Sequence, residues 1–187
     1  AVERLKHFVS RGAFDIEGLG ARHIAAFRAD GLITTPGDIF RLHRREAEIA
    51  ERPGWGPRSA ANLIAAIEAR RRIALERFVY ALGIPQVGQA TARLLARHYG
   101  SLAAWRAAMV AAADPASPAY LDLDNIDGVG PSVAGDVVAF FAEQSDFSCS
   151  GWDETSPVFA THDEWHRNNQ RLTREKLRRF LSGPILA

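Results

Sequence analysis

The sequence has one cysteine, Cys149, among its 187 residues, which excludes an internal disulfide and a zinc site built from several thiolates. It also lacks long apolar runs. The longest, such as residues 107–113 and 137–142, fall far short of the ~20 residues that a membrane-spanning helix needs. The first residues do not form the apolar centre of a signal peptide. From these absences we expect a soluble, cytoplasmic protein that has no membrane partner.

Lysine is scarce, because only Lys6 and Lys176 accompany 21 arginines. Genome composition can produce such a bias, but arginine also suits phosphate binding through its planar fork of donors. The charges are unevenly distributed although the net charge is only +1. Residues 1–113 hold 17 basic and 10 acidic side chains, residues 114–160 hold nine acids and no Lys or Arg, and residues 161–187 hold six bases and three acids. A polyanion is therefore attracted to the first segment and repelled by the second.

Helical patterns dominate the chain, and the alternating patterns of strands are nearly absent. Thr35 followed by proline, with Asp38 three residues on, is typical of a capped helix start. Ser101 begins an alanine-rich segment in which we expect Trp105 and Met109 to be buried. The sequence predicts an all-α fold.

A short glycine-containing bend occurs four times, each time before a segment with helical periodicity. We call these segments bends 1 to 4. They are Ile-Glu-Gly-Leu-Gly at 16–20, Arg-Pro-Gly-Trp-Gly at 52–56, Ile-Pro-Gln-Val-Gly at 84–88 and Ile-Asp-Gly-Val-Gly at 126–130. The predicted helices that follow them span residues 21–30, 57–71, 89–98 and 131–141.

Two glycines around one apolar residue allow a tight bend with left-handed backbone, and the apolar residue can then point inward. The bend leads into a helix N-terminus, whose unpaired backbone N–H groups suit an anion such as phosphate. Such contacts are independent of base sequence. A single bend of this kind is most often a plain connection between helices, but four copies at similar spacing favour binding to the backbone of duplex DNA.

The predicted DNA-binding residues belong to the bends or follow them closely. They are Gly18, Leu19, Gly20, Arg22, Arg52, Gly54, Trp55, Gly56, Arg58, Ser59, Val87, Gly88, Gln89, Thr91, Arg93, Gly128 and Gly130. Bend 2 is the best predicted phosphate binder because Arg52, Arg58 and Ser59 flank it. Bend 1 has the acids Asp15 and Glu17 beside it, although Arg11 and Arg22 lie close by. Bend 4 lies among aspartates without a basic neighbour, so we interpret it as mainly structural.

The bends and the residues between them resemble one family in particular. The runs at 14–20, 77–92, 126–131 and 139–143 are similar to the helix-hairpin-helix domain of bacterial NAD-dependent DNA ligases, and the resemblance covers roughly residues 1–143. Residues 6–11 also resemble the segment that follows the zinc module of that family. The resemblance implies four tandem helix-hairpin-helix motifs that work in pairs on the minor-groove side of nicked double-stranded DNA, across both strands.

The same resemblance indicates which parts of the family this sequence does not contain. Neither Lys6 nor Lys176 stands in the Lys-x-Asp-Gly motif of the nucleophilic lysine, and the zinc cysteines and the oligonucleotide-binding barrel have no counterpart. We therefore expect no catalytic residue, cofactor or metal in this chain. The resemblance implies a parent NAD-dependent DNA ligase that uses NAD, a divalent metal and structural zinc in replication and repair. It also implies that the other domains of that ligase are partners.

We expect the DNA-binding domain to span residues 1–143, and residues 144–187 to form a linker and a short basic helical tail. His162 and His166 have a spacing that one metal could use, but the flanking acids do not match a zinc-protease motif. The glycine of the 122–128 segment is one position late for a calcium loop. Two alternative functions remain open. One is a helix-hairpin-helix DNA glycosylase, which needs a catalytic aspartate well downstream of bend 4, and the other is a protein-interaction scaffold.

Overall fold

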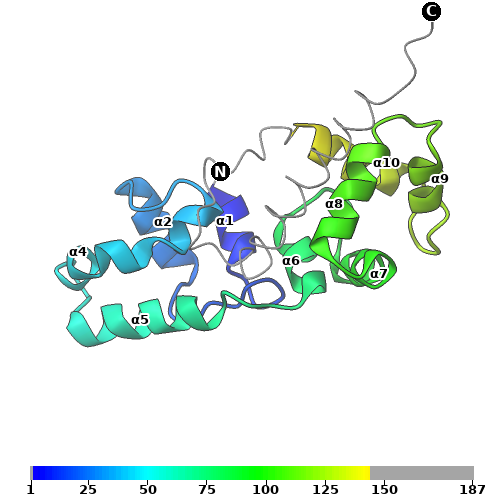
Figure 1. Ribbon diagram of the computed structural model, residues 1–187. Helices are drawn as coiled ribbons and strands as arrows, with labels where there is room; N and C mark the ends of the chain where they lie inside the picture. Colours follow the sequence, from blue (N-terminus) through cyan, green and yellow to red (C-terminus); the bar gives the residue numbers. More distant parts are fainter. Residues whose placement is uncertain (1, 144–187) are drawn as a thin grey trace, which may run out of the picture.

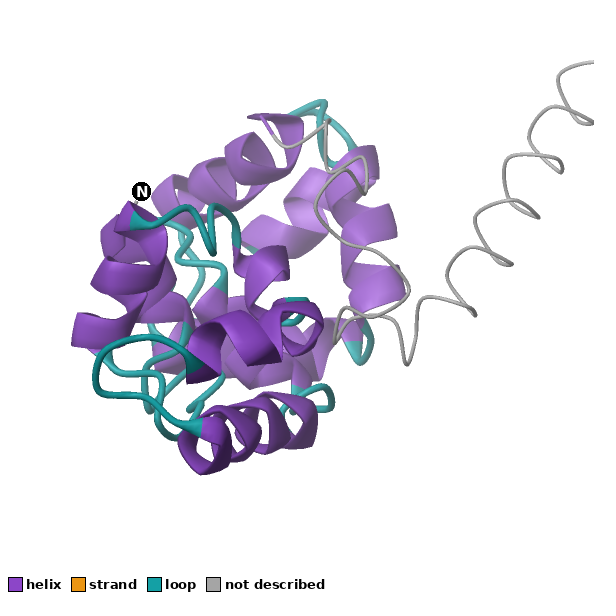
Figure 2. Ribbon diagram, turned by 90° about the vertical axis from the view of Figure 1, so that its left-hand side faces the viewer, coloured by secondary structure: helices purple, strands orange, loops and turns teal. Residues whose placement is uncertain are grey.

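A computed structural model describes residues 2–143, and every regular element in that range is a helix (Figures 1 and 2). In chain order the elements are α1 (Val2–Phe8), α2 (Ala21–Ala29), α3 (Pro36–Ile39), the 3₁₀ helix η1 (Leu42–Arg45), α4 (Glu46–Ala50), α5 (Pro57–Ala69), α6 (Leu75–Ala81), α7 (Gln89–Tyr99), α8 (Leu102–Ala111), α9 (Pro118–Asp124) and α10 (Pro131–Glu143). The all-α prediction is confirmed for these residues. The predicted linker and tail at 144–187, with His162 and His166, lie outside the described residues.

The helices form two groups on either side of a centre made by α1 and α6 (Figure 1). Helices α2, α4 and α5 lie at one end of the molecule, and α7 to α10 lie at the other. Bends 1 and 2 therefore belong to the first group, and bends 3 and 4 belong to the second.

A cluster of phenylalanines holds the first group to the centre. The ring of Phe14 stacks on that of Phe8 with centroids 4.2 Å apart, and it lies 5.3 Å from Phe40 and 6.4 Å from Phe78. All four side chains are buried. Each contributes roughly 2 kcal/mol by removal from water, so the cluster ties α1 to α6 and to the segment after α3.

The second group packs around Trp105, which the sequence predicts to be buried. Trp105 and Met109 on α8 are each only 1% exposed, which confirms the prediction that they are buried. The Trp105 ring meets the edge of Phe141 on α10 at 4.9 Å. Helix α8 is therefore the element against which α10 is positioned.

The helix start at Thr35 has the predicted cap. The backbone N–H groups of Thr34 and Thr35 donate to Asp38 Oδ2 at 2.8 and 2.7 Å, and Arg41 donates to the other carboxylate oxygen at 2.8 Å. Partial burial raises the pKa of Asp38, but the hydrogen bonds from Thr35 and Thr34 and the charge of Arg41 together lower that pKa below its usual value. This cap fixes the chain direction between α2 and α4.

One predicted helix is too long at its C-terminal end. Helix α5 ends at Ala69, two residues before the predicted end at Arg71. The side chain of Arg70 donates to the carboxylate and backbone carbonyl of Asp15, at 3.1 Å each, and Arg71 donates to the carbonyl of Phe40 at 2.7 Å. These contacts hold the end of α5 against the loops after α1 and α3.

Candidate nucleic-acid interface

The four bends share one pattern of backbone hydrogen bonds. In each, the N–H of the fourth residue donates to the carbonyl of the first, over 2.8–3.3 Å. The carbonyl of the last glycine then accepts from the N–H of the fourth residue of the following helix, over 2.9–3.0 Å. The N–H groups of the first three helical residues have no acceptor within residues 2–143. Helices α5 and α10 begin with proline, which has no N–H, so they offer two such groups instead of three. Each bend therefore ends in a helix N-terminus with unpaired donors.

The third residue of every bend has left-handed backbone. Its φ is +80° at Gly18, +82° at Gly54 and +87° at Gly128, a range that favours glycine. Gln86 takes the same conformation with φ +60°, although it carries a side chain. Bend 3 thus keeps the geometry of the others despite its different residue.

The last glycine of each bend does not have left-handed backbone. Gly20, Gly56 and Gly88 are helix N-caps with φ of −76°, −159° and −80°, which are values that any residue adopts. A Cβ built at these three positions or at Gly130 meets no atom within 4 Å. Glycine is also a weaker N-cap than serine, asparagine or aspartate. Nothing within residues 2–143 therefore explains glycine at these four positions.

The fourth residue of each bend, which directly precedes the last glycine, is apolar and is predicted to point inward. In three of the bends it does so. Leu19, Val87 and Val129 are between 1% and 6% exposed. Trp55 is half-buried, and its ring lies 4.9 Å from His23 and 5.6 Å from Phe27. Leu19 and Val87 can thus reach a ligand only through their backbone, whereas part of the Trp55 side chain is accessible.

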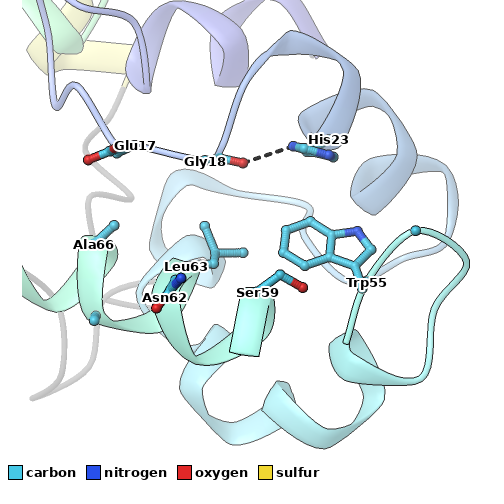
Figure 3. A pocket seen from close by; sticks show the side chains of 10 residues that line it. Glu17, Gly18, His23, Trp55, Ser59, Asn62, Leu63 and Ala66 are labelled. Carbon is cyan, nitrogen blue, oxygen red and sulfur yellow. Dashed lines mark hydrogen bonds between the residues drawn. The ribbon is translucent and has the colours of Figure 1, made fainter. Parts of the chain in front are cut away.

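Bends 1 and 2 face each other across a groove of about 560 Å³ between the start of α2 and α5 (Figure 3). Glu17 and Gly18 lie on one side of it, and Ser59, Asn62 and Leu63 line the other. The His23 ring closes one end, hydrogen bonded through Nδ1 to the carbonyl of Gly18 at 2.8 Å. Sequence reasoning gave His23 no role, although its position three residues after Gly20 places it beside the bend.

Bends 3 and 4 are joined by direct hydrogen bonds. The Gln86 side-chain amide donates to Ser132 Oγ at 2.8 Å and to Asp136 Oδ2 at 2.5 Å, and both acceptors belong to α10. On the other side of the pair, a Cβ at Gly128 would lie 2.9 Å from Leu94 Cδ1 on α7. Each bend of this pair therefore contacts the helix that follows the other bend.

The basic residues predicted to bind phosphate differ in how far they are already engaged. Arg22 and Arg58 are exposed and make no ion pair or hydrogen bond within the described part of the chain. Arg93 is also exposed, and its Nε lies 3.7 Å from a carboxylate oxygen of Glu76. Gln89 is exposed at the first position of α7, and Thr91 is half-buried. Arg22, Arg58 and Arg93 thus have guanidinium groups that can reach a ligand.

Two residues in or beside bend 2 that are predicted to bind phosphate already have partners within the protein. Arg52 forms an ion pair with Asp30, and its guanidinium lies over the Phe27 ring at 5.5 Å from the centroid. The Ser59 hydroxyl accepts from the N–H of Gly56 at 2.9 Å and donates to the carbonyl of the same residue at 3.0 Å. Of the three residues predicted to flank bend 2, Arg58 alone therefore has no hydrogen bond or ion pair within residues 2–143.

Two acidic side chains around bend 4 are hydrogen bonded to neighbours. Asp122 is hydrogen bonded to His98 at 2.8 Å, and Asp136 accepts from Gln86. Asp127, within the bend, is exposed. Bend 4 thus has the backbone geometry of the other bends in an acidic setting, which fits its interpretation as mainly structural.

No helix within residues 2–143 has the length and apolar character needed to cross a bilayer. The described part of the chain also holds no group of three or more His, Cys, Asp or Glu side chains arranged to bind a metal.

A comparison with protein families gives a match over the part of the chain that holds bends 3 and 4. Residues 77–148 match the family described as the helix-hairpin-helix motif, and this range includes bends 3 and 4. Bends 1 and 2, which lie outside the match, have the same backbone pattern.

Relatives with high identity cover most of the chain. The chain is 61% identical over 150 residues to a DNA ligase of Rhodospirillum rubrum. This match covers 77% of the chain and 22% of the relative. It is 52% identical over 163 residues to a DNA ligase of Gluconacetobacter diazotrophicus and 50% identical over 163 residues to one of Acidiphilium cryptum. These two matches cover 87% of this chain and 23% and 24% of the relatives. The matched segment is thus less than a quarter of each relative.

Proposed function

Because this chain holds a helix-hairpin-helix domain of the kind found in bacterial DNA ligases, we propose that it binds the sugar-phosphate backbone of nicked double-stranded DNA without reading base sequence. The DNA-binding domain is residues 1–143, and residues 144–187 are a linker and basic tail. In a parent ligase, which acts in the cytoplasm with NAD, a divalent metal and structural zinc, the domain holds the nick while other domains carry out the chemistry. Those domains are its protein partners.

The glycines that end the bends carry this proposal. Gly20, Gly56 and Gly88 have ordinary backbone angles, and no neighbour within residues 2–143 excludes a Cβ at these positions or at Gly130. A side chain is thus absent where the protein itself has room for one. Close approach of a ligand's backbone to the main chain is a general reason for glycine. A phosphate on the adjacent unpaired N–H groups is such a ligand.

The arrangement in pairs supports a duplex as the ligand. Bends 1 and 2 share one groove, and bends 3 and 4 are hydrogen bonded to each other's helices. Each pair therefore brings two helix N-termini into one neighbourhood, as the two phosphate rows of a duplex require. The exposed guanidinium groups of Arg22, Arg58 and Arg93 add positive charge beside bends 1, 2 and 3.

The proposal is tested by measuring the affinity of the chain for nicked duplexes of several sequences over a range of salt concentrations. Neutralisation of about three phosphates by arginine predicts that the logarithm of the binding constant falls with the logarithm of salt with a slope of about −3 or steeper. The slope and affinity should be the same for every sequence. A strong base preference combined with a flat salt dependence would refute the proposal.

A further inference from the structure

A second cavity, of about 430 Å³, lies where the loop after α1 meets the start of α7. Its walls carry Arg11, Arg77 and Arg93 with one opposing acid, Glu76. The remaining lining residues are Gly12, Tyr80 and Gln89. The formal charge of the lining is thus +2, which suits an anionic ligand.

The loop that carries Arg11 passes close to the start of α7 at the next residue, Gly12. A Cβ at Gly12 would lie 2.6 Å from Gln89 Nε2 and 2.9 Å from Tyr80 Cε1, which is closer than real contacts allow. A larger residue at this position would have to displace the ends of these two side chains, whereas glycine lets the loop pass close to the first residue of α7 without such a shift. The sequence suggested that Arg11 accompanies bend 1, which begins five residues later, but the fold places it next to bend 3.

A second arginine fixes the backbone of that loop. Arg77 on α6 donates from Nε to the carbonyl of Ala13 and from Nη2 to the carbonyl of Arg11, at 2.8 Å each. Its guanidinium group is therefore already hydrogen bonded to the loop. The Arg11 side chain, by contrast, is exposed and makes no ion pair or hydrogen bond within residues 2–143.

The other polar groups of the cavity are also available to a ligand. Arg93 is 66% exposed, and its 3.7 Å separation from Glu76 exceeds a normal hydrogen bond. The Gln89 side chain is exposed and directly follows Gly88, the last residue of bend 3. Two guanidinium groups and one amide thus converge beside the bend from two segments that are far apart in sequence.

We propose that Arg11, Gln89 and Arg93 together bind one phosphodiester group of the DNA backbone at bend 3. This inference rests on the proposed function and adds to it a contact from the loop after α1. It makes bend 3 a composite site, in which the bend supplies backbone donors and the loop after α1 supplies a guanidinium. Arg77 and Gly12 act as positioning residues for that contact.

The test compares Arg11→Ala and Arg11→Lys with Arg97→Ala, which removes an exposed arginine at the other end of α7. With nicked duplex, Arg11→Ala should weaken binding about tenfold and make the salt slope about one unit shallower, because one phosphate contact is lost. Arg11→Lys should recover most of the affinity and the slope, and Arg97→Ala should change neither. Equal thermal midpoints for all variants will show that each is folded.

The outcomes separate this inference from the proposed function. If the unmodified chain shows no salt-dependent DNA binding, the proposed function fails. If it binds DNA and Arg11→Ala matches it in affinity and slope, the composite site alone is refuted. A parallel titration with pyrophosphate tests for a small free anion as the ligand. Pyrophosphate binding that Arg11→Ala abolishes, with DNA binding unchanged, would overturn the assignment to a phosphodiester.

Discussion

Gln86 holds the third position of bend 3 in left-handed backbone, and its side-chain amide donates to the carboxylate of Asp136 on α10 at 2.5 Å. In the other three bends this position is glycine. A side chain in this conformation costs about 1–2 kcal/mol. The hydrogen bond to a charged acceptor contributes a similar amount, so the bond that connects bends 3 and 4 offsets the strain.

We expect Gln86→Ala to lower the free energy of unfolding by about 1–2 kcal/mol, because alanine keeps the strained backbone and loses the hydrogen bonds. Gln86→Gly loses the same bonds but removes the strain, so it should lie within about 1 kcal/mol of the unmodified protein. Urea denaturation measures both values. An alanine variant as stable as the original protein would show that the Asp136 contact does not stabilise the fold.

The two arginines of bend 2 should have opposite effects. Arg58→Ala should weaken binding to nicked DNA about five- to tenfold and leave stability unchanged, since the side chain is exposed and makes no hydrogen bond or ion pair within residues 2–143. Arg52→Ala should instead lower stability by about 1 kcal/mol, because it removes the contact with Phe27 and the ion pair with Asp30.

The matched control for Arg58→Ala is Asp127→Ala in bend 4. It removes an exposed acid from the bend that we interpret as mainly structural, so it should not weaken DNA binding. Fluorescence anisotropy with labelled duplex and thermal unfolding of the same samples give the two quantities. Equal losses of affinity for Arg58→Ala and Asp127→Ala would refute the ranking of the bends.

Asp38 should make stability depend on pH at the acidic end. Its pKa is lowered in the folded state, so its stabilising contribution is present above the pKa of the unfolded chain and disappears as pH falls through the lower folded value. Asp38→Asn should therefore reduce the thermal midpoint at pH 7 and reduce it less from about pH 4 downward. A difference between the two proteins that does not change with pH would contradict a role for the Asp38 charge.

Much of the local structure could be predicted from the sequence because its signals are local. Glycine spacing and helical periodicity locate the four bends, and the cap at Thr35 and the burial of Trp105 follow from neighbouring residues. The short elements α3, η1 and α4 have too few residues to produce a clear period. Their form depends on tertiary packing: Phe40, which follows α3, packs against Phe14, and α4 packs against α5.

The roles of individual arginines could not be predicted in the same way. Arg52 and Arg58 both flank bend 2 in the sequence, but Asp30, 22 residues earlier, is the ion-pair partner of Arg52. Arg11 reaches the start of α7 through the close approach of Gly12 to Gln89, a contact between segments 77 residues apart. Such pairings depend on tertiary structure, which the spacing of residues along the chain does not reveal.

The central claim is that the last glycine of each bend is there for the DNA backbone, and replacement of Gly88 by serine tests it most directly. Serine is a better N-cap than glycine, and a Cβ at this position meets no atom of residues 2–143 within 4 Å. Gly88→Ser should therefore unfold at the same or a higher temperature while its affinity for nicked duplex falls at least about tenfold. A variant that keeps both its stability and its affinity would contradict the account.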